Sequence, residues 1–224
     1  MTPRRMASIL QARNIQGILV CPRPTDYREL NLPWENFSAV TFGYTLKWPT
    51  LHRITATQFR GVTKIVNKLR ELGYERIGFT LTDQVNQRTD QNYLAAYVTD
   101  EYRHSRSFAI PPLKADLKQD PEALLQWIQQ YSIEVVVSPD TRPLDIMRRY
   151  QLRVPEEVGL ASCSVDSADS EISGICENSV QIGYTAVDFL VAMIHRGENG
   201  IPQHPQHILV EGSWSPGKTV RKVR

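Results

Sequence analysis

The sequence predicts an α/β fold in which parallel sheets carry helices on both faces. Short apolar runs alternate along the chain with stretches of helical periodicity, and this alternation indicates parallel strands joined by crossover helices. The run EVVVSP at 134–139 is continuous and β-branched, as expected of a strand that is buried on both faces. Ligands of such folds bind beyond the carboxyl ends of the strands, so the residues after each apolar run are candidates for a binding site.

The other extended segments follow from the same reading. RITAT at 53–57 is an extended segment that leads into a helix. VGLASC at 158–163 begins a buried strand, and Pro155 ends the loop that precedes this strand. The remaining runs predicted to be extended are 17–22, 38–43, 76–81, 105–110, 173–178 and 207–214.

The predicted helices show apolar residues every three or four positions. The helix over 58–72 is followed by Gly73, and the helix over 179–196 by Gly197, which suits the left-handed conformation of a helix end. Proline stands in the first turn of the helix predicted over 121–131. The other predicted helices cover 9–16, 87–102 and 142–152.

Composition bounds the class of protein. The chain has 224 residues, of which 41% are hydrophobic and 22% charged, with a net charge of +2. This is ordinary for one large globular domain or two small lobes, and it does not by itself indicate nucleic acid or membrane. The amino terminus lacks a secretory apolar core, and the spacing of Cys21, Cys163 and Cys176 suits neither a disulfide framework nor a metal knuckle. We therefore expect a cytoplasmic protein.

Motifs of catalysis and cofactor binding are missing from the sequence. It contains no glycine-rich phosphate loop, no G-x-S-x-G and no H-E-x-x-H. His204 and His207 in HPQH could bind a metal, but a solvated loop is the simpler interpretation. The basic end KTVRKVR is expected to be a solvated tail. We therefore predict no cofactor, no metal and no enzymatic activity.

Polar residues after the strands suit a small polyhydroxylated ligand. The guanidinium of Arg88 can donate several hydrogen bonds, although it could also pair locally. Asp140 can accept from a pair of hydroxyls or cap the helix that follows it. Ser164 follows VGLASC. We select these three residues as candidate ligand contacts.

A few aromatic residues could stack on a sugar face. Tyr44 and Trp48 follow the run at 38–43, and Trp34 precedes it. Packing of the loops is the alternative role for both tryptophans. Tyr44 and Trp48 join the predicted ligand site.

The order of these segments resembles the effector-binding domain of the LacI/GalR family of bacterial transcription regulators. The resemblance lies in IQGILVCP, AVTFGY, ITATQFRGVTKIVNKLRELGYERIGFTL, NQR at 86–88, VVVSPD, VPEEVGLAS, ISGICENSVQIGYTAVDFLVAMI and HILVEGSW. It extends from about Ser8 to Trp214.

The resemblance implies the fold of the type I periplasmic binding proteins, with two doubly wound parallel-sheet lobes joined by three crossovers. The crossovers would lie near Thr57, Asn178 and Glu211. The amino-proximal lobe would comprise 1–56 plus 179–210, and the carboxy-proximal lobe 57–178 plus 211–224. Members of the family hold the effector between the lobes.

The resemblance also implies roles for single residues. Arg88 matches an arginine that family members use to grip effector hydroxyls or carboxylates, and Asp140 matches an acidic position. Ser164 and Gly43 stand where many members have an aspartate. Glu177 stands where glutamine is common and is expected to orient the crossover.

One departure from the family concerns the front of the domain. Nothing in the sequence matches the DNA-binding headpiece, the hinge helix, or the first strand and helix of the amino-proximal lobe. We therefore expect that lobe to be incomplete, with open backbone edges and exposed apolar surface. Operator DNA is expected to be bound only through a headpiece that this chain does not contain.

The predicted function is that of the ligand-sensing domain of a transcription regulator. Its partners would be a sugar-like small effector and a second copy of the chain in a homodimer. One alternative is a solute-binding protein for transport, which needs an export signal. The other is an α/β enzyme, which needs a nucleophile–base pair or a metal set at the strand ends.

Overall fold

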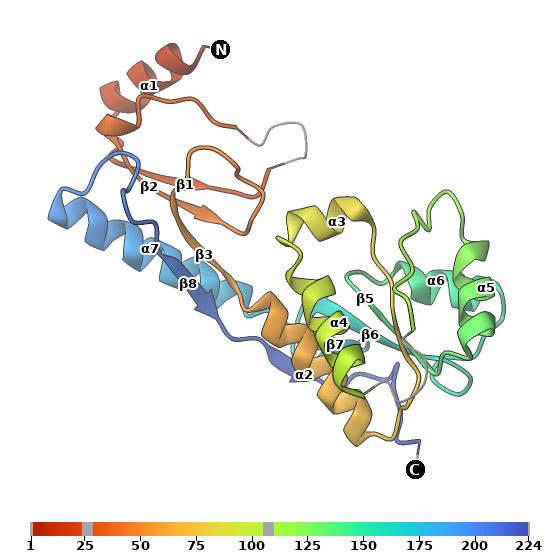
Figure 1. Cartoon of the computed structure of the whole chain (residues 1–224). Coiled ribbons are helices and arrows are strands. Elements are labelled where there is room, and N and C mark those ends of the chain that lie inside the picture. Colours follow the sequence, from red (N-terminus) through yellow and green to blue (C-terminus); the bar gives the residue numbers. More distant parts are fainter. Residues whose placement is uncertain (1, 24–28, 105–109, 224) are drawn as a thin grey trace. The chain divides into compact units, whose positions relative to one another are not determined.

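A computed structural model describes residues 2–23, 29–104 and 110–223 (Figure 1). The chain divides into two compact units, each with its own parallel sheet. Unit 1 comprises Met1–Ala56 and Asn178–Val210, and unit 2 comprises Thr57–Glu177 and Glu211–Arg224. The chain therefore passes from one unit to the other three times, as the predicted fold class requires.

Unit 1 contains a four-stranded sheet of order β1-β2-β3-β8, and all its pairs are parallel. One face packs against α7 through Val40, Ile54, Ala186, Leu190 and Met193. The other face is covered by loop side chains and the short η2. Its elements are α1 (Pro3–Ala12), β1 (Gly17–Val20), η2 (Trp34–Asn36), β2 (Ser38–Phe42), β3 (His52–Ala56), α7 (Ser179–Arg196) and β8 (His207–Val210).

Trp34 belongs to the core of that second face. Its side chain is 3% exposed and packs with Val20, Ala39, Leu46 and Leu51. The indole Nε1–H donates to the carbonyl of Leu30 at 3.2 Å. Trp34 is therefore a packing residue, which agrees with the loop-packing alternative and contradicts a role as a stacking platform for a sugar.

The sheet of unit 1 is continuous. β1 pairs directly with β2, with Gly17 beside Ser38 and Val20 beside Thr41. The backbone edges that we expected within this sheet are therefore closed by direct pairing. Among the described strands, β1 has β2 as its single neighbour and β8 has β3, so the sheet has open edges at β1 and at β8.

Unit 2 contains a five-stranded sheet of order β4-β5-β6-β7-β9. The first four strands are mutually parallel and β9 is antiparallel to β7. The carboxyl ends of β4 to β7 therefore share one edge. The elements are α2 (Gln58–Glu71), β4 (Ile77–Phe79), α3 (Asp83–Arg88), α4 (Asn92–His104), α5 (Glu122–Tyr131), β5 (Val135–Ser138), α6 (Arg142–Arg149), β6 (Gly159–Val165), β7 (Ser173–Cys176) and β9 (Ser213–Ser215).

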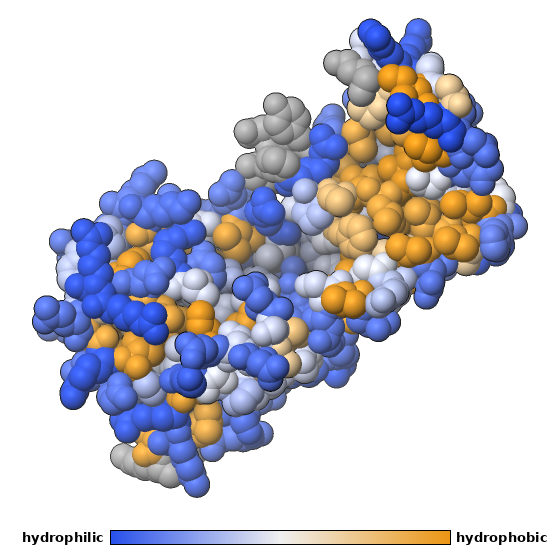
Figure 2. Space-filling model, turned by 180° about the vertical axis from the view of Figure 1, so that it is seen from behind, coloured by the Kyte–Doolittle hydropathy of each residue, from blue (hydrophilic) through white to orange (hydrophobic). Residues whose placement is uncertain are grey.

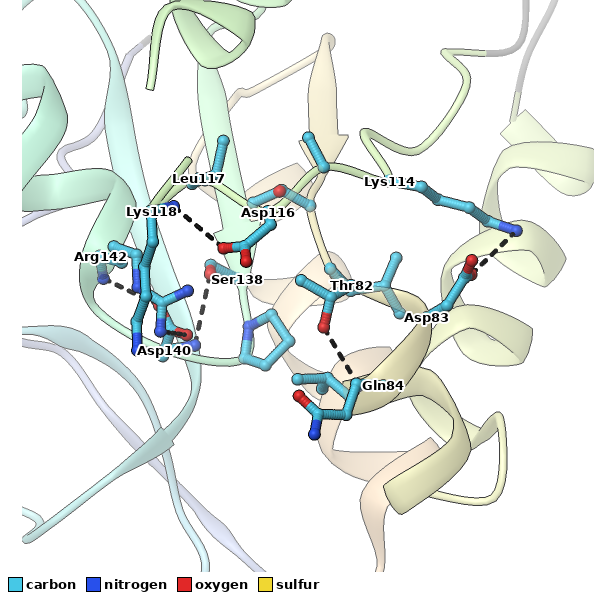
Figure 3. A pocket seen from close by; sticks show the side chains of 15 residues that line it. Thr82, Asp83, Gln84, Lys114, Asp116, Leu117, Lys118, Ser138, Asp140 and Arg142 are labelled. Carbon is cyan, nitrogen blue, oxygen red and sulfur yellow. Dashed lines mark hydrogen bonds and ion pairs between the residues drawn. The ribbon is translucent and has the colours of Figure 1, made fainter. Parts of the chain in front are cut away.

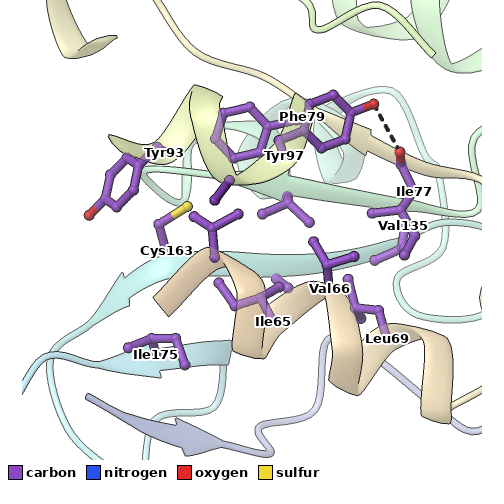
Figure 4. Packing of buried hydrophobic residues seen from close by; sticks show 14 of the residues in the cluster. Ile65, Val66, Leu69, Ile77, Phe79, Tyr93, Tyr97, Val135, Cys163 and Ile175 are labelled. Atoms are coloured by element: carbon purple, nitrogen blue, oxygen red, sulfur yellow. Dashed lines mark hydrogen bonds between the residues drawn. The ribbon is translucent and has the colours of Figure 1, made fainter. Parts of the chain in front are cut away.

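Helices cover both faces of this sheet, as the sequence predicted. Side chains of α2 and α4 pack on one face, where the rings of Phe79 and Tyr97 stack with centroids 5.3 Å apart (Figure 4). Side chains of α5 and α6 pack on the other face. Gly78 of β4 allows the close approach of α5, because an added Cβ would lie 2.4 Å from the indole of Trp127.

Three predictions about single segments were wrong. The run 207–214 forms two strands in different sheets, because the chain passes between the units at Val210 and Glu211. The predicted helix over 87–102 is divided between α3 and α4, with Asp90 and Gln91 at φ 51° and 62°. The carboxyl end of the described chain is anchored to unit 2, since the Thr219 hydroxyl donates to the Leu160 carbonyl at 2.7 Å.

One predicted strand cannot be compared with the structure. Residues 105–109 of the strand predicted over 105–110 lie outside the described residues. None of the helices in the described ranges combines the length and the apolar character needed to cross a membrane.

Candidate functional site

A pocket of about 390 Å³ lies at the carboxyl ends of β4 and β5 in unit 2 (Figure 3). Its walls come from three segments: 80–85 after β4, 114–118, and 138–142 after β5. This volume is within the range of about 300–1,000 Å³ that is typical of small-molecule sites. The pocket occupies the position where the fold class places a ligand.

The charged side chains around the pocket are balanced. Asp83, Asp116 and Asp140 stand beside Lys114, Lys118 and Arg142. The ammonium Nζ of Lys114 lies 3.9 Å from Oδ1 of Asp83, and Nη2 of Arg142 lies 3.2 Å from Oδ2 of Asp140. Hydroxyls of Thr80, Thr82 and Ser138 complete the polar lining. Such a lining suits an uncharged guest with many hydroxyl groups.

Local hydrogen bonds position the pocket walls. The Thr82 hydroxyl accepts from the backbone N–H of Val85 at 3.2 Å and caps α3. The carboxylate of Asp140 accepts from the backbone N–H of Arg142 at 2.9 Å at the start of α6. The N–H of Asp140 donates to the Ser138 hydroxyl at 3.3 Å. Asp140 therefore both stabilises the start of α6 and lines the pocket.

Arg88 is the last residue of α3 and does not line the pocket. Its side chain is exposed at the end of α3, whereas the pocket is lined by the first turn of that helix. Arg88 forms no ion pair with another described residue. The structure thus brings Asp140 into the pocket and leaves Arg88 out of its walls.

A second polar cluster stands at the ends of β6 and β7. The Ser164 hydroxyl donates to Oε2 of Glu177 at 3.2 Å, and the Tyr93 hydroxyl of α4 donates to Oε1 at 3.2 Å. Burial raises the pKa of the Glu177 carboxyl, and the two hydrogen bonds oppose that rise. The family resemblance implied only an orienting role for Glu177. The one sequence signal for a binding role was its position directly after a buried strand.

The charges of Asp140 and Glu177 both act on the thiol of Cys163. This thiol is buried in β6, and burial raises its pKa, with further contributions from the charges of Glu177 and Asp140. Both carboxylates therefore lie within electrostatic range of one thiol. The carboxyl edge of β5, β6 and β7 thus carries Asp140, Ser164 and Glu177 on neighbouring strands.

The candidate residues of unit 1 follow β2. Gly43 has φ +63°, a left-handed conformation that favours glycine. Tyr44 is buried, with the Arg53 guanidinium carbon 4.6 Å from its ring centroid and His207 edge-on at 6.4 Å. Trp48 is 45% exposed. Of these candidates, Trp48 presents an exposed aromatic ring, whereas the ring of Tyr44 is largely covered by its neighbours.

Among the described residues, no group of three or more His, Cys, Asp or Glu side chains is placed to hold a metal ion. His207, one of the two histidines of HPQH, instead stands beside the ring of Tyr44 and 3.4 Å from Nη1 of Arg53.

Solved structures share this fold over nearly the whole chain. The match to a LacI-type regulator from Alkaliphilus metalliredigens QYMF complexed with D-xylulofuranose has a TM-score of 0.70 at 15% identity, covering 96% of this chain and 82% of that chain. The match to the lactose repressor bound to an anti-inducer has a TM-score of 0.69 at 15% identity, and it covers 97% of this chain and 82% of that chain. The match to a LacI family regulator from Enterococcus faecium with bound ribose has a TM-score of 0.66 at 12% identity, and it covers 100% of this chain and 86% of that chain.

At sequence identities of 12–15%, these matches show that the proteins share a fold, and they show no more than that. A search of curated proteins found no match. The family model of the periplasmic binding protein-like domain matches residues 66–220, which is more than half of the chain. The chain therefore belongs to the periplasmic binding protein-like domain family, and its fold is that of the solved LacI-type transcriptional regulators.

Proposed function

We propose that this chain is the ligand-sensing domain of a LacI-type transcription regulator and binds a sugar or a related small polar effector. The observation that carries the proposal is the pocket of about 390 Å³ at the carboxyl ends of β4 and β5, with its hydroxyls and balanced charges. Related folds support it, since their solved structures include complexes with cellobiose, D-xylulofuranose and ribose.

The proposal assigns ligand contacts to the ends of the strands. Asp140 accepts hydrogen bonds from sugar hydroxyls while its second interaction, with Arg142, keeps the carboxylate in place. Arg88 is exposed and has no competing ion pair with the described residues, so its guanidinium is available to a ligand. The further proposed contacts are Ser164, Gly43, Tyr44 and Trp48.

Control of transcription belongs to the same proposal. Effector binding would change DNA binding by a headpiece, in a cytoplasmic homodimer. The domain would bind its effector without transforming it, so we assign no catalytic residue.

A thermal-shift experiment with a matched variant tests the proposal. D-ribose, D-xylulose and cellobiose are added to the parent, Asp140→Asn and Asp120→Asn. Asp120 is the control because it also accepts from a backbone N–H near a helix start, that of Ala123 at 3.2 Å, but lies outside the pocket. A ligand at a hundredfold excess over Kd stabilises the folded state by about 2.7 kcal/mol.

We expect a sugar that stabilises the parent and Asp120→Asn to lose most of its effect on Asp140→Asn. An unchanged shift in Asp140→Asn would remove Asp140 from the site. If none of the sugars shifts the melting temperature of the parent, effector binding of this class is contradicted.

A further inference from the structure

Apolar side chains on the outer side of α7 follow the spacing of a coiled coil. Val180, Tyr184, Val187 and Val191 are separated by intervals of four, three and four residues, and all four are exposed. Alternating intervals of three and four residues place side chains in one stripe along a helix, which is the seam through which a second helix packs. Exposed apolar residues that stand singly need no explanation, but a regular series of them does.

The stripe lies apart from the side of α7 that packs on the sheet. That side carries Ala186, Leu190 and Met193. Because successive residues of an α-helix are about 100° apart, the centre of the stripe lies about 130° around the helix from Ala186. Gly183 borders the stripe, and outside its own turn of the helix no described atom lies within 4 Å of the position that a Cβ would take there. A second helix can therefore approach the stripe closely without meeting the sheet of unit 1.

A second copy of α7 in antiparallel orientation fits this stripe. A two-fold axis midway between Tyr184 and Val187 places each of these residues beside the other one in the partner. The same axis places Val180 beside the partner's Val191, so that every tyrosine packs on a smaller valine and the layers of the seam are filled evenly. In a parallel pair, Tyr184 would face the partner's Tyr184 and each valine its own counterpart, so wide and narrow layers would alternate. The sizes of the side chains along the stripe therefore favour two antiparallel copies.

Polar residues that border the stripe suit the same arrangement. Gln181 and Asp188 are exposed, and the two-fold axis brings Gln181 of one copy opposite Asp188 of its partner. Nε2 of Gln181 donates to the Thr185 hydroxyl at 3.4 Å, and its second N–H can donate to the carboxylate of the partner's Asp188. A hydrogen bond to a charged acceptor is stronger than one between neutral groups. The polar border thus supports the pairing that the apolar residues indicate.

The size of the stripe predicts a weak, reversible dimer. Its four side chains expose on the order of 400 Å² in each copy, which is half of the about 800 Å² that one partner contributes to a standard interface. Flanking residues such as Gln181 and Asp188 add to this area. We therefore expect a dissociation constant in the micromolar range. Well below that concentration the chain is a monomer, and the stripe is in contact with water.

We propose that the stripe of α7 is a homodimer interface, through which two copies of this chain pack their α7 helices in antiparallel orientation. This inference rests on the homodimer of the proposed function, since it names the surface that forms it. The stripe belongs to unit 1, whereas the pocket at the carboxyl ends of β4 and β5 belongs to unit 2. Dimerisation is therefore expected in the absence of an effector.

Sedimentation equilibrium without added sugar tests the interface. The parent, Val187→Asp and Val98→Asp are compared from about 1 µM to about 500 µM, a range that brackets micromolar dissociation constants. Val98 of α4 is the matched control because it is also an exposed valine within a helix, 50% exposed against 46% for Val187. We expect Val187→Asp to weaken the dimer at least about thirtyfold, because it places a carboxylate without a cation in the seam. Val98→Asp should dimerise like the parent.

The outcomes separate the interface from the homodimer as such. A dimer of unchanged strength in Val187→Asp overturns the inference and leaves the homodimer of the proposed function to another surface. A parent that stays monomeric over the whole range contradicts the inference and that homodimer together. Sugar binding in unit 2 is measured separately, so neither outcome bears on the pocket.

Cross-linking tests the antiparallel register and covers the case in which Val187→Asp does not fold. Val180→Cys and Val191→Cys are combined in one chain, together with Cys21→Ser because Cys21 is exposed. The two positions are about 16 Å apart along one helix, whereas a disulfide needs Cα atoms about 4.4–6.8 Å apart, so it can join them only between copies. We expect linked dimers from the double variant and none from either single variant. Linked dimers from the single variants, or an unlinked double variant at concentrations where the parent dimerises, overturn the inference.

Discussion

The two units treat their apolar surface differently. Unit 2 covers both faces of its sheet with helices, whereas unit 1 has α7 on one face and loop side chains on the other. Of the fourteen exposed large hydrophobic side chains in the described part of the chain, ten belong to unit 1, although it is the smaller unit. Figure 2 shows hydrophobic residues gathered on its surface. Unit 1 thus leaves more of its apolar surface in water.

The exposed residues of α7 form a stripe. Val180, Tyr184, Val187 and Val191 recur every three or four positions and are 73%, 64%, 46% and 43% exposed, so they share one side of the helix. The side that contacts the sheet carries Ala186, Leu190 and Met193. A surface helix normally confines its apolar residues to the core side. Together with the open edge of β1, the stripe predicts that unit 1 is the less stable unit.

The largest expected effect comes from a matched pair of core truncations. Ile77 of β4 and Ile54 of β3 are both 0% exposed, one in each unit. Ile77→Ala should reduce the free energy of unfolding by about 4 kcal/mol, and Ile54→Ala by about 2 kcal/mol, because the cost of a cavity falls where the surroundings can relax. Urea denaturation followed by the tryptophans of each unit measures both values. Equal costs would contradict the comparison.

Hydrogen exchange tests the same difference without mutation. Amides of β5 should exchange only on global unfolding of unit 2, whereas amides of β1 and β2 should exchange through local opening that needs about 3 kcal/mol less. The open edge of β1 and the exposed stripe are the physical reasons. Equal protection in Gly17–Val20, Ser38–Phe42 and Val135–Ser138 would show that unit 1 is as well packed as unit 2.

The sequence was sufficient to predict the fold of unit 2, because the strands of that unit are short apolar runs buried on both faces. EVVVSP, for example, has no plausible alternative to a buried strand. Asp140 lines a pocket because residues that follow parallel strands meet at one edge of the sheet, and its contact with a ligand stays a prediction. The sequence did not anticipate that α3 ends at Arg88 and that Asp90 and Gln91 turn the chain there. The contact of Glu177 with Tyr93 joins residues 84 positions apart, and no local pattern carries that information.

The smallest expected effect separates exposed from buried positions on α7. Tyr184→Ser changes a side chain that is 64% exposed, so the free energy of unfolding should change by no more than about 0.5 kcal/mol. Ala186→Ser, on the same helix but at 0% exposure, should cost about 1–2 kcal/mol, because it buries a hydroxyl against the sheet. Thermal denaturation of unit 1 measures both, and binding of a hydrophobic dye should fall only in Tyr184→Ser. A large cost for Tyr184→Ser would mean that this side chain is covered in solution, and the apolar surface that distinguishes unit 1 would then be smaller than its exposure indicates.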